Sequence, residues 1–235
     1  MFFGAAVFDQ DLSAWDVGSA TSLKQMFRGT SDTVTNVYNQ SLNAWNVAKV
    51  TDMEGVFADT KYFSKEIGSW NTAKVITMKD MFKGATAFAQ NLNDWDVGKV
   101  ATMNQMFMGA TMFNAPVNAW NVAKVEDTIS MFNGATLFNQ DLGAWDVGTN
   151  NFANVAGVAA DYGIVKLAPA GGHTGGNPAT NSKFLDMFTG TTSMSDCNKK
   201  AIQNKFVAAP RSLGVVFDPA ITPTAGWSYP NLVCP

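Results

Sequence analysis

Apolar and polar positions recur with one period through the first two-thirds of the chain. Tryptophan marks the period at Trp15, Trp45, Trp70, Trp95, Trp120 and Trp145, so four of the five intervals are 25 residues long. The 30-residue interval carries an insertion, TSDTVTNV, before Tyr38. Each unit reads roughly M-F-x-G-A-x-x-F-N-Q-x-L-x-x-W-[DN]-V-x-x-V-x-[ST]-M. One such unit cannot bury its own apolar face, so the units are expected to stack into a solenoid.

Two elements with different periods are predicted in each unit. The L-x-x-W-x-V stretch alternates around tryptophan, which predicts a half-buried strand. Methionine and phenylalanine then follow at i, i+3 and i+4, as in Met78, Met81 and Phe82, which predicts one face of a short helix. The residues expected to cap these helices at the N-terminus are Ser22, Asp52, Thr77, Thr102 and Asp127. Those expected to end them in a left-handed conformation are Gly29, Gly84, Gly109 and Gly134, with Asp59 as the exception.

The predicted fold class is therefore an α/β repeat solenoid. It resembles the leucine-rich-repeat coil in having one short parallel strand and one short helix per unit. Three segments are expected: a six-coil solenoid over residues 1–155, an irregular glycine-rich insert over 156–182, and a degenerate last repeat with a C-terminal cap over 183–235. No matching cap precedes the first unit, so the first coil is expected to need upstream repeats or a partner to cover it.

An acid or amide follows every tryptophan of the repeat. If the tryptophans point inward and stack at the strand spacing of about 4.8 Å, these neighbours point outward. The outward column is Asp16, Asn46, Asn71, Asp96, Asn121 and Asp146. No two aspartates are adjacent in it, so amides separate the carboxylates and cross-strand hydrogen bonds are kept. Two interpretations stay open: a polar ladder that only stabilises the stack, or a recognition surface.

A lysine occupies one further position in four successive coils. The lysine stripe is Lys49, Lys74, Lys99 and Lys124. Lysines on a sheet edge discourage aggregation between sheets, which is the structural interpretation. An anionic partner that docks along the lysine stripe is the functional one.

Composition narrows the function classes. The chain has a formal net charge of -3 and a pI near 5.0, which argues against general nucleic-acid binding. No apolar run reaches the 18 or so residues of a membrane-spanning helix. The only histidine, His173, lies in a glycine-rich loop with no second ligand or triad partner near it in the sequence. We therefore expect neither an enzyme nor a bound metal or cofactor.

Both cysteines fall near the C-terminus. Cys197 and Cys234 form either a pair of buried thiols or a disulfide that staples the last segment. A disulfide would imply an oxidising compartment.

The repeat phrase M-F-x-G-A-x-x-F-N-Q-x-L-x-x-W-[DN]-V closely resembles the repeats of BspA-like surface proteins, a branch of the leucine-rich-repeat solenoids. The resemblance covers residues 1–155 strongly and 183–206 weakly. It implies a right-handed solenoid, display at the cell surface or outside the cell, and a role in adhesion or protein binding, with no catalytic residues to carry over. We expect a non-catalytic module that binds a protein or a glycan. The alternative is a structural or accessory subunit of a larger assembly, such as an algal or protist one in an oxidising organelle lumen, docked through its first coil or its strand face.

Overall fold

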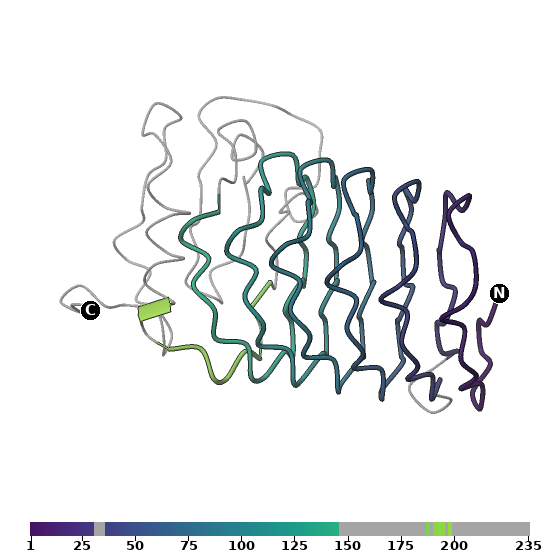
Figure 1. The fold of residues 1–235 in the computed structure, drawn as a ribbon. Helices are drawn as coiled ribbons and strands as arrows, with labels where there is room; N and C mark the ends of the chain where they lie inside the picture. The colour runs from purple at the N-terminus through teal and green to yellow at the C-terminus, as the bar shows by residue number, and fades with distance from the viewer. Residues whose placement is uncertain (31–35, 146–186, 189, 196, 199–235) are drawn as a thin grey trace, which may run out of the picture.

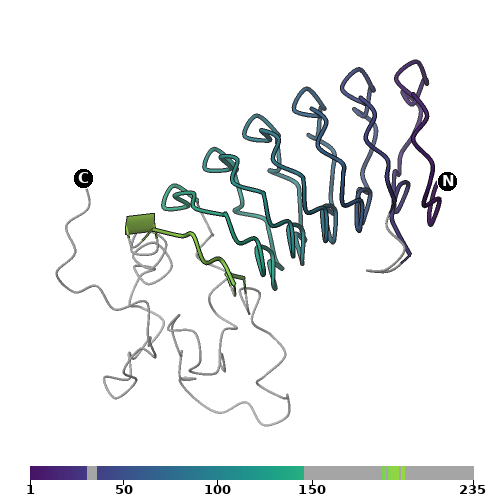
Figure 2. The same ribbon diagram turned by 90° about the horizontal axis from the view of Figure 1, so that it is seen from below.

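The computed structural model describes residues 1–30, 36–145, 187–188, 190–195 and 197–198. Within them the repeats lie side by side as a row of coils, in chain order from the purple N-terminal coil to the teal coil that ends at Trp145 (Figure 1). The view from below shows the same row stepping steadily from one coil to the next (Figure 2). Residues 187–188 and 190–195 continue the row, because the Phe132 N–H donates to the Met187 carbonyl and the Ser193 N–H to the Thr136 carbonyl.

Along one side of the row each coil forms consecutive β-turns, and backbone hydrogen bonds from these turns connect neighbouring coils. We call this side the turn ladder, comprising residues 22–29, 52–59, 77–84, 102–109 and 127–134. In the first of these segments, the N–H groups of Leu23, Gln25 and Phe27 donate to carbonyls of the next coil at 2.8–3.0 Å. The N–H groups between them bond within their own coil instead, as in the Met26 N–H that donates to the Leu23 carbonyl. Hydrogen bonds therefore alternate between the coil itself and its neighbour.

The short helices predicted for these segments are wrong. A helix requires every N–H to bond four residues back and every φ to be negative. Here Gln25, Asp80, Gln105 and Ser130 have φ between 53° and 57°, and Gly55 has φ of 59°. The side chains predicted as helix caps close turns instead: Asp52 Oδ1 accepts the Glu54 N–H at 2.9 Å, and Ser22 Oγ accepts the Lys24 N–H at 3.2 Å. An i, i+3 apolar spacing is compatible with consecutive turns as well as with a helix, so the spacing alone could not exclude turns.

The strands predicted around tryptophan are also wrong. Each L-x-x-W closes a β-turn, in which for example the Trp95 N–H donates to the Leu92 carbonyl at 3.1 Å. Extended pairing in the described residues is limited to isolated parallel bridges that link Ser22, Asp52, Thr77, Thr102 and Asp127 in that order. The helix that the described residues contain is Cys197–Asn198. The part of the chain that the structure describes thus has almost no helix and almost no strand, and the predicted α/β class is overturned.

Aromatic rings fill the interior in columns. The longest column takes one phenylalanine from each coil, with adjacent ring centroids 5.5–5.8 Å apart: Phe2, Phe27, Phe57, Phe82, Phe107, Phe132 and Phe188. A second column lies beside it, at 3.9–4.2 Å within each coil: Phe8, Tyr38, Phe63, Phe88, Phe113 and Phe138. Burial of these rings makes a large apolar contribution to stability.

The tryptophans join neighbouring coils by hydrogen bonds as well as by packing. The five tryptophans from Trp45 to Trp145 are buried. Each of their indole Nε1–H groups donates to the carbonyl of the Leu, Ile or Val that begins the L-x-x-W phrase one coil earlier, at 2.8–3.2 Å. Trp70 stacks on Trp95 at 6.3 Å and Trp120 on Trp145 at 6.4 Å, which is wider than the strand spacing that we expected. Trp15 is different, with 42% of its surface exposed.

The F-N-Q phrase of the repeat has the same connecting role. The Asn39 side-chain oxygen accepts the Ser64 N–H at 3.1 Å, and the Asn114 side-chain oxygen accepts the Asn139 N–H at 2.8 Å. The Gln140 side-chain amide donates to the Asn114 carbonyl at 2.8 Å. The Asn and Gln of this phrase therefore help to hold neighbouring coils together.

Replacing Gly109 by alanine tests the turn geometry. Gly109 has φ of 71° and follows Gly84 in the ladder, with an added Cβ 3.8 Å from the Gly84 Cα. The loss in free energy of unfolding should be about 1–2 kcal/mol, because a side chain is strained in the left-handed region even where space allows it. Chemical denaturation measures it.

Gly98→Ala is the matched control. Gly98 is not left-handed, and the equivalent position holds alanine in other coils, at Ala48, Ala73 and Ala123. Its effect should stay within about 0.5 kcal/mol. Equal losses in the two variants would contradict the assigned turn conformation.

Candidate functional site

The predicted acid-and-amide column lies on the surface and forms turns. Asp16, Asn46, Asn71, Asp96 and Asn121 are exposed, and Asp146 lies outside the described residues. Each described side chain accepts the backbone N–H two residues ahead, at 2.9 Å for the aspartates and 3.2 Å for the asparagines. This local bond is the usual reason for Asp or Asn at a turn. The acid or amide after tryptophan therefore shapes the backbone of its own coil.

The lysine stripe lies at the corner that these turns make. The Val50 N–H donates to the Val47 carbonyl at 2.9 Å, so Lys49 occupies the third position of a β-turn. The same bond recurs in the coils of Lys74, Lys99 and Lys124, at 2.8–3.0 Å. All four lysines are exposed, and none of them pairs with a carboxylate of a described residue. Each turn thus holds one ammonium group at an equivalent place on its coil.

Other predicted residues fall wholly or partly outside the described part of the chain. His173 and Cys234 lie outside it, as does the insert over 156–182. Cys197 is disulfide-bonded. Within the described residues, no group of three or more His, Cys, Asp or Glu side chains is placed to hold a metal ion. Nor is any helix among them long and apolar enough to cross a membrane.

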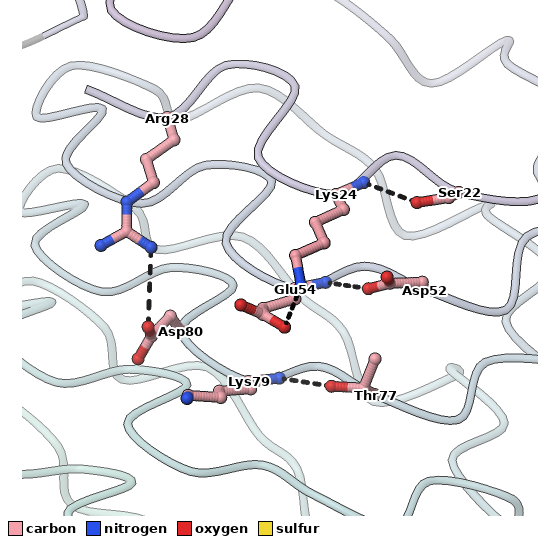
Figure 3. Close-up of polar contacts among 8 residues, drawn as sticks. All are labelled: Ser22, Lys24, Arg28, Asp52, Glu54, Thr77, Lys79 and Asp80. Atoms are coloured by element: carbon pink, nitrogen blue, oxygen red, sulfur yellow. Dashed lines mark hydrogen bonds and ion pairs between the residues drawn. The ribbon is translucent and has the colours of Figure 1, made fainter. Parts of the chain in front are cut away.

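The turn ladder presents a second polar surface. Lys24 donates to Glu54 of the next coil at 2.8 Å, and this hydrogen bond and the charge of Glu54 raise the pKa of Lys24 (Figure 3). Lys79 lies on the coil that follows, on the same side (Figure 3). Both lysines are exposed, while Glu54 is half-buried.

One ion pair on this surface spans two coils. Arg28 reaches Asp80 at 3.6 Å, although Gly55 lies on the coil between them (Figure 3). The absence of a side chain at Gly55 makes the reach possible, because an added Cβ there would lie 3.3 Å from Arg28 Nη1. Asp80 is 7% exposed and has φ of 57°. Arg28 therefore adds a connection between non-adjacent coils, which the sequence alone does not indicate.

An exposed apolar column was missed in the sequence. It precedes the second aromatic column by one residue, and its exposed members are Val7, Tyr62, Met112 and Leu137. A threonine row lies next to it, where Thr111 and Thr136 each donate a hydroxyl to the threonine carbonyl one coil earlier, at 3.3 and 3.2 Å. The phrase G-A-T before the apolar residue was visible at Gly84, Gly109 and Gly134, and it was the available signal.

These observations define the chain as a repeat protein built from stacked, turn-rich coils. The recurring side chains of the repeat either fill the core or form hydrogen bonds between coils. The family model described as "Mycoplasma protein of unknown function, DUF285" matches residues 1–88 and 53–161. The two matches together cover residues 1–161 of 235, and the chain belongs to this family. Membership suggests a repeat-containing surface protein.

No curated protein matches the chain, and no solved structure does.

Proposed function

We propose that the chain is a non-catalytic recognition module of a surface protein, in the manner of the BspA-like repeats, and that the turn ladder contacts a protein partner. The supporting observation is a contrast between columns. The buried column of Phe57, Phe82 and Phe107 repeats one residue type, whereas the outward column on the same turns changes from coil to coil. That variable column is Lys24, Glu54, Lys79, Asn104 and Ile129.

Such an arrangement suits binding to one particular surface. Hydrogen bonds between coils hold the backbone below each variable residue, as in Asp80 N–H to the Asn104 carbonyl at 2.9 Å. A fixed backbone lowers the entropy lost when the side chains above it are immobilised by a partner. A mixture of positive, negative, amide and apolar groups then gives specificity through complementary charge and shape.

Site-specific photo-crosslinking on intact cells tests the proposal. A crosslinker placed at Lys79 or at Asn104 should capture the same discrete protein, because both residues lie in the variable column. Asn91 is the matched control, since it is exposed and lies about half a repeat away along the coil.

A charge swap then tests the contact itself. Glu54→Lys together with Lys79→Glu leaves the net charge unchanged and should reduce the captured product about tenfold, the scale of one or two lost charge pairs. Equal capture from Asn91 would contradict the proposed face. Capture by a crosslinker placed at Trp15, with none from Lys79 or Asn104, would favour the accessory-subunit alternative.

A further inference from the structure

We propose that the lysine stripe binds a linear acidic polysaccharide, at a surface distinct from the turn ladder. Lys49, Lys74, Lys99 and Lys124 stand at the same turn position in four successive coils. All four are exposed, and described carboxylates form no ion pair with them. Four like charges in a row repel one another, so a polyanion lying along the row is favoured by charge complementarity.

Repetition of the charge identifies the kind of ligand. The variable column of the turn ladder suits one particular partner surface, but an invariant column suits a ligand that repeats along its own length. Equivalent rings of neighbouring coils stack 5.5–6.4 Å apart, so the ammonium groups recur at one coil spacing. A linear polymer with an acidic group on its repeating sugar offers a matching row of charges.

The backbone holds each lysine in place. Asn46 Oδ1 accepts the Ala48 N–H at 3.2 Å, and the Val50 N–H closes the turn around Lys49. Asp96 and Gly98 make the equivalent bond before Lys99 at 2.9 Å. The acid-and-amide column thus positions the lysine turns, which gives that column an indirect part in the proposed site.

A nucleic acid fits this surface less well. Duplex binding requires a broad basic face, but the stripe is one lysine wide and the chain carries a formal net charge of -3. Single-strand binding uses aromatic side chains on which bases stack. The residue preceding each lysine is small instead: Ala48, Ala73, Gly98 and Ala123.

Binding of polygalacturonate to the full chain tests the inference, with neutral dextran and single-stranded poly(dT) as comparison ligands. The stripe variant carries Lys→Gln at 49, 74, 99 and 124. The matched control removes the same charge outside both the lysine stripe and the turn ladder, with Lys→Gln at 65, 166, 183 and 199. We expect the stripe variant to bind polygalacturonate about tenfold or more weakly, and the control variant to lose less than about threefold. Raising NaCl from about 50 to about 200 mM should weaken wild-type binding about tenfold or more.

Three results would overturn the inference. They are an absence of wild-type binding to polygalacturonate at low salt, equal losses in the two quadruple variants, and tighter stripe-dependent binding to poly(dT). The last would assign the stripe to nucleic acid. Thermal unfolding of both variants establishes that they remain folded. Crosslinking from the turn ladder reports the proposed protein-binding function separately, so either idea can fail without the other.

Discussion

Replacement of Phe107 by alanine should lower the free energy of unfolding by about 3–5 kcal/mol. Phe107 is fully buried, and its ring stacks on Phe82 and Phe132, both at 5.5 Å, and on Phe113 at 3.9 Å. Alanine would leave a cavity in the first aromatic column, next to the second. The cavity cannot close fully, because the other rings of the neighbouring coils keep those coils apart. Equilibrium denaturation followed by tryptophan fluorescence measures the loss.

The same substitution at Phe3 is the control. Phe3 is 53% exposed, so Phe3→Ala should cost about 1 kcal/mol or less. Because contacts in a coil stack are made between neighbours, the Phe107 variant should also unfold less cooperatively, with its two halves separating in denaturant. A loss below about 1 kcal/mol for Phe107→Ala would contradict the phenylalanine column as the core.

Trp120→Ala should be similarly destabilising, by about 3–5 kcal/mol. Trp120 is buried, and its Nε1–H donates to the Leu92 carbonyl at 2.8 Å. Trp120→Phe separates the two contributions, because it keeps an aromatic ring but removes one of the two donors to the Leu92 carbonyl, which still accepts the Trp95 N–H. The expected cost of that lost hydrogen bond is about 0.5–1.5 kcal/mol. Thermal and chemical unfolding measure both variants.

Trp15 provides a comparison at the same position of the repeat. Its ring is 42% exposed, although it contacts Phe2 at 5.8 Å. Trp15→Ala should therefore cost less than half as much as Trp120→Ala. Equal costs would contradict the expected contributions of burial and of the indole bond between coils, because Trp15 is much less buried than Trp120.

The candidate surfaces were partly foreseeable. The outward position of Asp96 and Lys99 follows from their placement beside residues that are inward in every repeat, and both are exposed in the structure. The role of Asp96 in a turn was not foreseen. Its position suggested hydrogen bonds to the neighbouring coils, whereas its side-chain oxygen accepts the Gly98 N–H of its own coil. The ion pair between Arg28 and Asp80 was hidden for another reason: it joins coils that are not adjacent and depends on Gly55 between them.

The sequence by itself determined the length of the repeat and which side chains of each repeat are buried, since both follow from periodic apolar positions. It also indicated the left-handed residues at Gly84, Gly109 and Gly134, because glycine is the residue that adopts this conformation at least cost. The same prediction was wrong for Gly29, and Asp59 is left-handed with φ of 60° although it is not a glycine. The tertiary structure alone decided the backbone. The N–H of Leu23 has its partner at Asp52 in the next coil, and the left-handed turns at Gln25 and Asp80 are held by such bonds. The spacing of apolar residues along one segment carries no information about its hydrogen bonds to another segment. A helix and a series of turns therefore fit the same apolar pattern, and only the stacking of the coils selects the turns.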